Sequence, residues 1–405
     1  MTMATQTDDG YAPATLRSLI GQELRRVCVA RFGDSLRAVV LTGSVARDEA
    51  TVVRENQGLM CVSDADVFVI LADHSPPPSH AEEKEVARAV ASLLKAKGIS
   101  IKIGVAAVDE TFLRSMPTHI EVYELRECGV VLWGDSNILS LIPAFDASRI
   151  SREDAWRLIC NRMVECLEAI ALANGDESSP DVFYKMVKLN LDMATSYLVF
   201  AEQYAPTYNA RARRLKVLAE ENAWAPMPLG AFADIVAICT AYKIGRGAAV
   251  TPNVSWQDTV CLVRQLWRWE LSLLSGVTDE LSDHELLATW MTQQPLKAKL
   301  RGWASVMRRS RLIDNCLQAP RWFRFASPIK GSPRYWIYSV AASLYFRFPL
   351  LTLTGDQVEA RYWDILASRL PLRTDLNTGR APDDYLSTAR LVALNYRQFL
   401  ETTTA

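Results

Sequence analysis

Two aspartates one residue apart are the most chemically informative feature of this 405-residue sequence. Asp64 and Asp66 stand at the start of the otherwise apolar stretch DADVFVIL. In a β-strand, side chains i and i+2 point to the same face, so both carboxylates would project from one side. Like charges at that separation repel each other, and a divalent cation relieves the repulsion. Two hard oxygen ligands predict a site for Mg²⁺, or Mn²⁺, with water and substrate phosphates completing the coordination.

A second feature, the Gly43-Ser44 pair, follows directly after the apolar run LRAVVLT. A glycine at the end of a strand lets the backbone approach a ligand closely, because it has no Cβ. The backbone N–H groups that follow and the Ser44 hydroxyl can then hold phosphate oxygens. The order of apolar strand, Gly-Ser, spacer and paired aspartates therefore predicts a metal-dependent phosphate site.

Hydrophobic periodicity indicates the elements that must position these residues. Residues 13–32 and 81–98 have the spacing of amphipathic helices. Residues 36–43, 65–71 and 99–108 have the composition of short, buried strands. The first 145 residues therefore predict an α/β lobe with a small mixed sheet.

The pattern changes after Pro143, and helical periodicity dominates from about Ser148 onward. A chain of this length suggests more than one domain. We predict one domain over residues 1–145 and a mostly α-helical region over 146–405, and a further division near 295 stays open.

The segments LTGSVARDE and SDADVFVI resemble the nucleotidyltransferase superfamily typified by DNA polymerase β. The motif of that superfamily is a hydrophobic residue with Gly-Gly or Gly-Ser, a spacer, and two acids separated by one hydrophobic residue. The resemblance covers roughly residues 35–135. It implies that Ser44, beside Gly43, contacts a triphosphate and that Asp64 and Asp66 bind the catalytic metal. The implied reaction moves a nucleoside monophosphate from an NTP to a hydroxyl acceptor and releases pyrophosphate.

The sequence departs from the superfamily pattern in two places. The spacer before Asp64 is long, and its TVVRENQGLMC portion has the composition of an inserted loop. The superfamily usually places a third carboxylate on the next strand, where Lys102 is the only charged residue of ISIKIGVAAV. The nearest acids follow that strand, and we predict that Asp109 helps to activate the acceptor hydroxyl. The alternative is a catalytically impaired nucleotide-binding protein with a regulatory or interaction role on the same fold.

Two lysines in the segment YKMVKLNLD form a further candidate phosphate site. Lys185 and Lys188 are three residues apart, so they would share one face of a helix. Members of the superfamily often place a lysine of the helical lobe on the triphosphate, and either residue could match. An ordinary solvated basic face is the competing interpretation.

The charge of the chain is polarised, although its formal net charge is only −1. Between residues 297 and 347 there are eleven Lys or Arg and one acid, Asp314, for a net charge of +10. Aromatic residues such as Trp322 are interleaved with these cations. This pattern is typical of nucleic-acid binding, but also of a membrane-surface patch or of a face that pairs with the acidic first part of the chain.

Composition excludes several other classes. The eight cysteines form no CxxC pair and only four histidines are present, which argues against a zinc site and against a disulfide framework. The apolar stretch 335–353 contains Arg347 and Pro349, so we predict a buried helix and a break rather than a membrane span. With no signal peptide evident, we predict a cytoplasmic enzyme. ATP is the default donor by abundance, and a small molecule or a protein is favoured over RNA as the acceptor.

Overall fold

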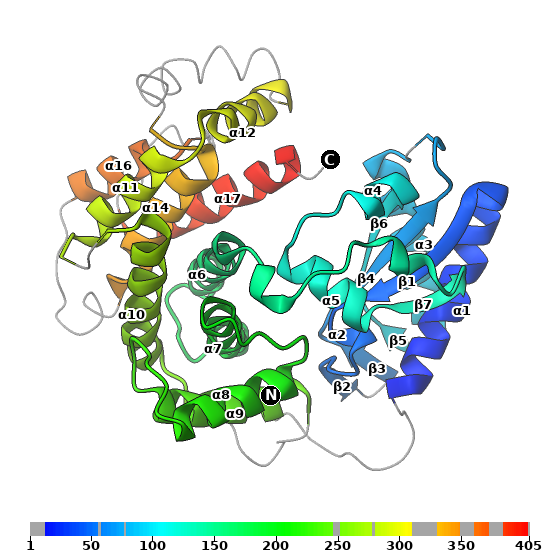
Figure 1. Ribbon diagram of the computed structural model, residues 1–405, viewed down its shortest axis with the longest axis horizontal. Helices are drawn as coiled ribbons and strands as arrows, with labels where there is room; N and C mark the ends of the chain where they lie inside the picture. Colours follow the sequence, from blue (N-terminus) through cyan, green and yellow to red (C-terminus); the bar gives the residue numbers. More distant parts are fainter. Residues whose placement is uncertain are drawn as a thin grey trace. The chain divides into compact units, whose positions relative to one another are not determined.

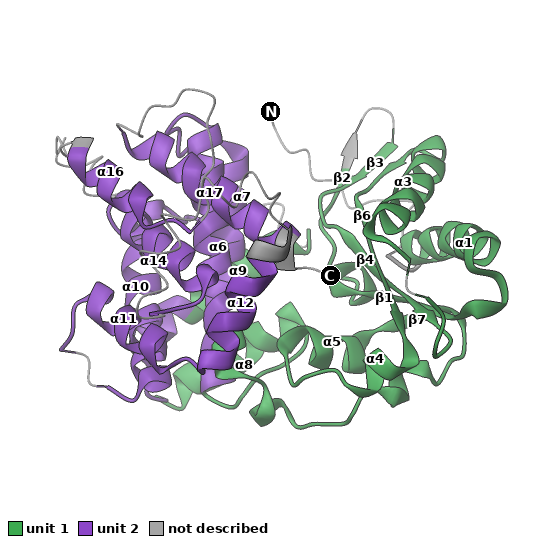
Figure 2. Ribbon diagram, turned by 90° about the horizontal axis from the view of Figure 1, so that it is seen from above, with its two compact units in different colours: residues 1–154, 201–222, 233–252 green, residues 155–200, 223–232, 253–405 purple. Residues whose placement is uncertain are grey.

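The computed structural model describes most of the chain, and the description below is confined to that part. The described residues are 13–55, 58–76, 78–245, 252–277, 280–309, 330–348, 360–371 and 384–403. They divide into two compact units (Figure 2). The N-terminal unit comprises residues 1–154, 201–222 and 233–252, and the helical unit comprises residues 155–200, 223–232 and 253–405.

The N-terminal unit is built on a four-stranded mixed sheet with the strand order β6-β4-β1-β7 (Figure 1). Strand β1 pairs antiparallel with both β4 and β7, whereas β4 and β6 are parallel. The small mixed sheet that was predicted for this region is confirmed. The strands are β1 (Leu36–Thr42), β4 (Ala65–Leu71), β6 (Ile103–Asp109) and β7 (Val130–Gly134).

Helices cover both faces of this sheet, because successive side chains of its two central strands point to opposite sides. One face packs on α1 (Pro13–Phe32) and α3 (His80–Ala96), and the other on α4 (Glu110–Arg114) and α5 (Ile120–Cys128). The two predicted helices, 13–32 and 81–98, are therefore confirmed. The first face buries Leu16, Ile20, Leu24, Val39, Leu41, Val67, Val69, Val86, Val90 and Leu94, and the second buries Ala38, Val40, Ile70, Leu113, Val122 and Leu125.

The segment that was predicted to be an inserted loop is instead a pair of strands. Strands β2 (Val52–Glu55) and β3 (Gly58–Cys61) pair antiparallel, and β3 also pairs parallel with β5 (Ile99–Ser100). The predicted strand over 99–108 is consequently divided between two sheets, β5 in the smaller one and β6 in the larger one. The β-branched run Thr51-Val52-Val53 was the signal for a strand, and the polar residues around it concealed it.

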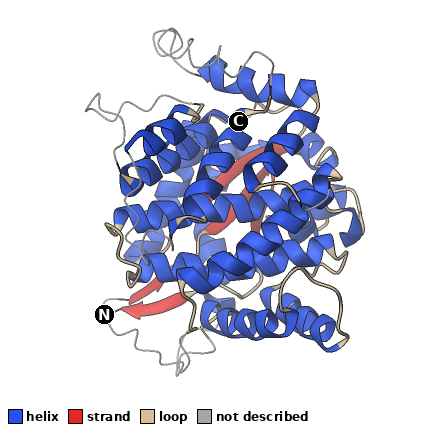
Figure 3. Ribbon diagram, turned by 90° about the vertical axis from the view of Figure 1, so that its left-hand side faces the viewer, coloured by secondary structure: helices blue, strands red, loops and turns tan. Residues whose placement is uncertain are grey.

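The helical unit contains no strand among its described residues. Figure 3 shows the described helices in blue and the strands in red. The core of the helical unit is aromatic: the rings of Trp156, Trp267, Tyr335 and Tyr338 lie within about 6 Å of one another along a chain of pairs. The helices are α6 (Arg152–Leu172), α7 (Pro180–Phe200), α10 (Trp256–Ser275), α11 (Asp283–Gln293), α12 (Leu296–Arg309), α14 (Pro333–Tyr345), α16 (Ala360–Ser368) and α17 (Tyr385–Thr403).

The observed partition of the chain differs from the predicted boundary at 145. Two later stretches, 201–222 and 233–252, belong to the N-terminal unit. They carry α8 (Tyr208–Glu220) and most of α9 (Leu229–Lys243). No division near 295 is present in the two-unit partition. Periodicity along the sequence could not reveal this exchange, because a helix that packs on the sheet has the same pattern as one that packs on other helices.

The predicted buried helix over 335–353 is confirmed for its first part. Helix α14 ends at Tyr345, and most of its side chains are buried. Among the described residues, no helix combines the length and the apolar composition that crossing a membrane requires. The described cysteines are all free thiols, and five of them are buried.

The basic segment 297–347 lies partly outside the described residues. Residues 310–329, which include Trp322, are not described, and neither are the side chains of 307–309. One of the interleaved aromatic residues, Tyr335, is fully buried, and its hydroxyl accepts a hydrogen bond from Arg157 (2.7 Å). Tyr335 is therefore a core residue and is not available to stack on a base.

Candidate functional site

The Gly43-Ser44 turn begins where the central strand β1 ends. Gly43 has a φ of +72°, a conformation that residues with a Cβ rarely adopt, and it starts the short helix α2 (Gly43–Ala46). Ser44 is half-buried, and its hydroxyl makes no hydrogen bond within the described part of the chain. The turn thus presents a hydroxyl group that is not committed to the fold.

Asp66 lies directly beside this turn. Strands β1 and β4 pair so that Thr42 is opposite Asp66, and β4 and β6 pair so that Asp66 is opposite Gly104. A Cβ at Gly43 would lie 3.1 Å from one Asp66 carboxylate oxygen, and a Cβ at Gly104 would lie 2.8 Å from the other. The absence of side chains at both positions therefore makes room for this carboxylate.

Asp64 lies just before β4 and is also exposed, so the two aspartates share the solvent-facing side, as predicted. Its carboxylate accepts a hydrogen bond from the Lys102 ammonium group at 2.9 Å. That ion pair is open to water, because the Lys102 side chain is 79% exposed and the Asp64 side chain 45%. Screening by water makes such a pair weak, so a divalent cation can compete with Lys102 for Asp64.

The part of β6 that lies beside the aspartates carries no third acid. The parallel register places Gly104 opposite Asp66, and Lys102 immediately precedes that strand. Asp109, which we predicted as the third acid, is at the other end of β6, opposite Leu71. Five residues of strand separate it from the Gly104 position, or roughly 16 Å. Its carboxylate caps α4 by accepting from the Phe112 N–H at 2.7 Å, so its predicted place in the site is wrong.

Glu121 is a carboxylate near Asp66 that sequence reasoning missed. It lies in the first turn of α5, and the backbone N–H of the preceding residue, Ile120, donates to Asp154 (3.0 Å). The Glu121 side chain reaches solvent, but protein on its other sides desolvates it and raises its pKa, and the charges of Asp66, Asp154 and Glu124 raise it further. No motif marks it, because it is brought to Asp66 only by the packing of α5.

A buried ionic network holds α5 against the Gly43-Ser44 turn. Arg47 follows α2 directly and donates to Glu124 at 2.6 Å and to Glu49 at 3.3 Å. Arg211 of α8 approaches the same Glu124 carboxylate at 3.4 Å. Glu49 also accepts from the backbone N–H of Tyr208 at 3.0 Å, where α8 begins. The Arg and Glu of GSVARDE therefore connect the turn to two helices.

A buried lysine supports the other end of the site. Lys243, at the end of α9, is 3% exposed, and its ammonium group donates to the hydroxyls of Ser63 and Thr51, each at 2.9 Å. Its backbone carbonyl accepts from Thr51 at 2.6 Å. Ser63 directly precedes Asp64, so this contact fixes the start of the aspartate segment.

The two candidate lysines of α7 lie in the helical unit and differ from each other. Lys185 donates to Glu165 at 2.9 Å, so its charge is already paired. Lys188 makes no hydrogen bond or ion pair within the described part of the chain, and its closest described partner is the ring of Tyr184. Burial, followed by the charge of Arg162, lowers the Lys188 pKa to about 8.

The surroundings of Lys188 carry an excess of positive charge. Arg162 is buried and pairs with Asp192 at 2.6 Å, and it also contacts Glu165. Three cations, Arg162, Lys185 and Lys188, thus share two carboxylates. An anion beside Lys188 would balance the remaining charge, and Lys188 is therefore the stronger of the two predicted phosphate ligands.

The residues of the N-terminal site can bind a magnesium ion only if a substrate supplies further ligands. Among the described residues, no group of three or more His, Cys, Asp or Glu is close enough to hold a metal ion. The two carboxylates of Asp64 and Asp66 remain, and Mg²⁺ commonly combines one or two carboxylates with water and substrate phosphates. The space at Gly43 and Gly104 permits such an approach, so the donor set fits Mg²⁺ bound together with a phosphate group.

Comparison with models of known protein families finds no match, and no curated protein matches the chain in sequence. The functional argument therefore depends on the geometry of the residues described above.

Proposed function

We propose that this protein is a metal-dependent nucleotidyltransferase that moves a nucleoside monophosphate from an NTP, with ATP as the default donor, to a hydroxyl acceptor. One observation carries the proposal. The Gly43-Ser44 turn and the Asp66 carboxylate lie side by side on an exposed edge of the sheet, with no Cβ at Gly43 or Gly104 to obstruct a ligand. A phosphate-binding turn beside paired carboxylates is the arrangement that nucleotidyl transfer requires.

Each protein group then has a defined task. The Ser44 hydroxyl and the backbone N–H groups of its turn would bind triphosphate oxygens. Lys188, in the helical unit, is a separate candidate for binding a phosphate group. Mg²⁺ held by Asp64 and Asp66 would neutralise the negative charge that develops at the α-phosphate. Lys102 would release Asp64 when the metal binds.

Glu121 takes the role of general base that we first assigned to Asp109. Its raised pKa makes it a stronger base than an ordinary glutamate. The acceptor oxygen forms a bond to the α-phosphorus as the bond to the bridging oxygen breaks. The proton moves to Glu121, and pyrophosphate leaves with the bonding electron pair.

The acids around Asp66 also favour one class of acceptor. The charges of Asp66 and Asp154 act on Glu121, whereas Glu124 is already paired with Arg47 and Arg211. The negative charge of Asp66, Glu121 and Asp154 attracts a small hydroxylated compound that carries an amine, more than it attracts an RNA 3′ end. A protein hydroxyl beside basic residues would also suit this charge.

A second candidate function is nucleotide binding without turnover. Lys102 and Gly104 occupy the positions beside the aspartates where a third acid would be expected, and this observation favours a regulatory or interaction role. In that case Mg²⁺-ATP would bind and stabilise the protein, but pyrophosphate would not be released with any acceptor.

Pyrophosphate release with Mg²⁺-NTP and a panel of hydroxylated amines tests the proposal. We expect release that depends on the metal and is reduced at least about 100-fold in Asp66→Asn and in Glu121→Gln. Asp109→Asn serves as the matched control and should retain its turnover. Thermal stabilisation by Mg²⁺-ATP without pyrophosphate release would favour the second candidate function. If Mg²⁺-ATP caused neither stabilisation nor release, both candidate functions would be contradicted.

A further inference from the structure

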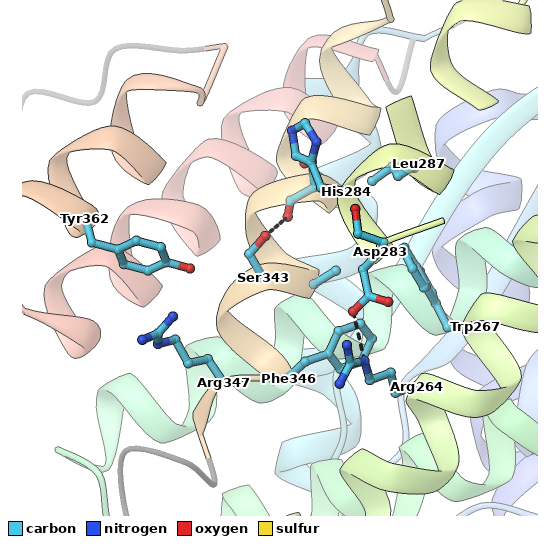
Figure 4. A pocket seen from close by; sticks show the side chains of 12 residues that line it. Arg264, Trp267, Asp283, His284, Leu287, Ser343, Phe346, Arg347 and Tyr362 are labelled. Carbon is cyan, nitrogen blue, oxygen red and sulfur yellow. Dashed lines mark hydrogen bonds and ion pairs between the residues drawn. The ribbon is translucent and has the colours of Figure 1, made fainter. Parts of the chain in front are cut away.

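The helical unit contains a cavity of about 320 Å³ that none of the residues of the candidate site lines. Four helices contribute to its walls: α10, α11, α14 and α16. Its lining combines two arginines with aromatic rings and serine hydroxyls. Figure 4 shows Arg347 and Tyr362 on one side of the cavity, Arg264 and Asp283 on the other, and Ser343 between them.

Arg347 is a cation without a counter-ion among the described residues. Its guanidinium carbon lies 4.7 Å from the centre of the Tyr362 ring, and its Nε is inaccessible to water and has no hydrogen-bond partner. A buried charged donor without an acceptor costs free energy, and such groups usually mark a missing water, ion or ligand. Cation–π contact with Tyr362 orients the guanidinium but accepts none of its hydrogen bonds.

The opposite wall carries an ion pair. Asp283 accepts a hydrogen bond from Arg264 at 2.9 Å and also pairs with Arg268. Besides His284, the charged residues that line the cavity are two arginines, Arg264 and Arg347, and one acid, Asp283, so their net charge is +1. His284 adds no positive charge at neutral pH, because burial and the nearby Arg369 lower its pKa.

No hydrogen bond joins Arg347 Nε to a serine hydroxyl of the cavity. The Ser343 hydroxyl donates to the Ser339 carbonyl at 2.8 Å, and the Ser282 hydroxyl donates to Glu285 at 2.6 Å. The planar fork of guanidinium N–H groups matches the oxygens of a carboxylate or a phosphate. The volume is at the small end of the range for ligand sites, which suits a small metabolite.

We propose that this cavity binds a small organic oxyanion, a carboxylate or a phosphate ester, with Arg347 as its principal ligand. The site is formed entirely within the helical unit and does not depend on the metal or on the proposed transfer reaction. It adds a second ligand site to the protein, in which an anionic metabolite would stabilise α14 and α16 by joining Arg347 to the wall formed by α10 and α11.

Calorimetric titration of the full-length protein tests this proposal. Citrate, a sugar phosphate and inorganic phosphate are the probes, and EDTA together with Asp64→Ala and Asp66→Ala removes the metal-dependent site from the measurement. We expect at least one probe to bind at millimolar concentration or below. Arg347→Met should weaken that binding by about tenfold or more, because charge-assisted hydrogen bonds are lost.

Matched variants separate this site from general charge effects. Arg301→Met removes an exposed arginine of the same unit that does not line the cavity, and it should bind the probe like the parent protein. Arg347→Lys keeps the charge but loses the planar fork, so an intermediate affinity is expected. Thermal unfolding of Arg347→Met without ligand should match or exceed that of the parent, because an uncompensated charge is removed.

The outcomes are distinct. Binding of citrate alone identifies a carboxylate ligand, and binding of the phosphates alone identifies a phosphate ligand. The proposal is overturned if no probe binds to the parent protein, or if Arg347→Met binds the probe as well as Arg301→Met does. Neither result would bear on pyrophosphate release, because the proposed transfer reaction uses none of the residues that line this cavity.

Discussion

The position of the Asp66 carboxylate depends on what its neighbours lack. Gly43 and Gly104 face its two oxygens from opposite strands, and a methyl group at either position would displace it. Lys102 acts on the other aspartate, because it supplies a cation where a metal ligand would be expected. At the residue scale, the site therefore depends on two glycines, which leave space for Asp66, and on Lys102, whose charge competes with a metal ion for Asp64.

Removing the competing charge should strengthen metal binding. In Lys102→Ala, Asp64 loses its ion pair. We therefore expect Mg²⁺ or Mn²⁺ affinity in the presence of an NTP to rise about two- to fivefold, which corresponds to the free energy of an exposed ion pair. Titration calorimetry measures this change. Lys95→Ala, at an exposed lysine of α3, is the control, and an equal affinity in both variants would show that Lys102 does not compete with the metal.

Adding a methyl group beside Asp66 should reduce turnover. In Gly104→Ala, the new Cβ would lie 2.8 Å from an Asp66 oxygen, so the carboxylate must move. We expect turnover to fall by about 100-fold, as displacement of a catalytic group by 1 Å can cause. Stability should change by less than about 1 kcal/mol, because alanine is tolerated in a strand. The control is Gly230→Ala, whose Cβ would have no neighbour within 4 Å, and it should retain both properties.

At the scale of elements, two helices carry the groups that the strands do not supply. Helix α5 brings Glu121 toward Asp66, and the Arg47–Glu124 ion pair holds that helix against the turn. Helix α7 presents Lys188 in a cluster that has one more cation than its carboxylates can pair. Each helix is positioned by buried charges, so both positions are sensitive to the loss of a single partner.

The Arg47–Glu124 ion pair should therefore contribute far more to the free energy of unfolding than an exposed ion pair does. Burial acts to lower the Arg47 pKa, but Glu124, Tyr208, Glu49 and Tyr204 together outweigh it and the pKa is raised, so the charged pair is favoured. Arg47→Met leaves Glu124 buried without this partner, and we expect a loss of about 3–5 kcal/mol in the free energy of unfolding. Denaturant titration measures it. Arg31→Met, which breaks the exposed pair with Glu82, should cost less than about 1 kcal/mol, and equal losses would contradict the assignment.

Lys188 should give α7 a characteristic pH dependence. Its pKa is about 8 in the folded protein and near the ordinary 10.5 when unfolded, so folding releases a proton between these values. The contribution of Lys188 to stability is unfavourable below about pH 8 and becomes less unfavourable as the pH rises toward 10.5. Lys188→Met should accordingly be more stable than the parent at pH 7, and the difference should shrink at pH 10. Thermal melts at both pH values measure this, and a difference that does not depend on pH would contradict the lowered pKa.

The affinity of Lys188 for an anion should decrease as the pH rises. The ammonium form attracts phosphate, so NTP affinity should decrease as the pH rises above about 8 in the parent protein. Lys188→Met should bind NTP more weakly at pH 7 and lose this dependence, whereas Lys185→Met, whose charge is paired with Glu165, should keep it. An unchanged affinity in Lys188→Met would remove this lysine from the phosphate site.

At the scale of the whole molecule, local patterns predicted the sheet and the motif but not the partners that long-range packing supplies. Alternation and helical periodicity were sufficient for β1, β4, α1 and α3, and the strand period placed Asp64 and Asp66 on one side. The predicted place of Asp109 in the site was wrong. Strand β6 begins at Ile103, four residues later than predicted, and continues up to Asp109, so Asp109 lies at the end of the strand that is far from Asp66. Glu121 and Lys243 could not be predicted, because both reach the site through helix packing across many residues.

The division of the chain gives a final prediction. The chain passes between the two units several times, and the N-terminal unit takes α8 and most of α9 from the region that we had predicted to be a separate helical domain. A fragment of residues 1–154 would therefore keep the sheet but lose Arg211 and Lys243. Without them, Glu124 loses one of its two guanidinium partners, and the hydroxyls of Ser63 and Thr51 lose their buried ammonium donor.

We expect this fragment to show no cooperative thermal unfolding, although it contains the complete Gly43-Ser44 and aspartate motif. Lys243→Met in the full-length chain gives an independent measure, since it removes one of the lost groups without removing a helix. It should lower the free energy of unfolding by about 1–3 kcal/mol, the cost of losing the hydrogen bonds that the buried ammonium group donates to Ser63 and Thr51. Calorimetry of the fragment and of the variant tests both expectations. A fragment that unfolds cooperatively near the temperature of the full chain would show that residues 1–154 fold alone and that the later helices contribute little to the site.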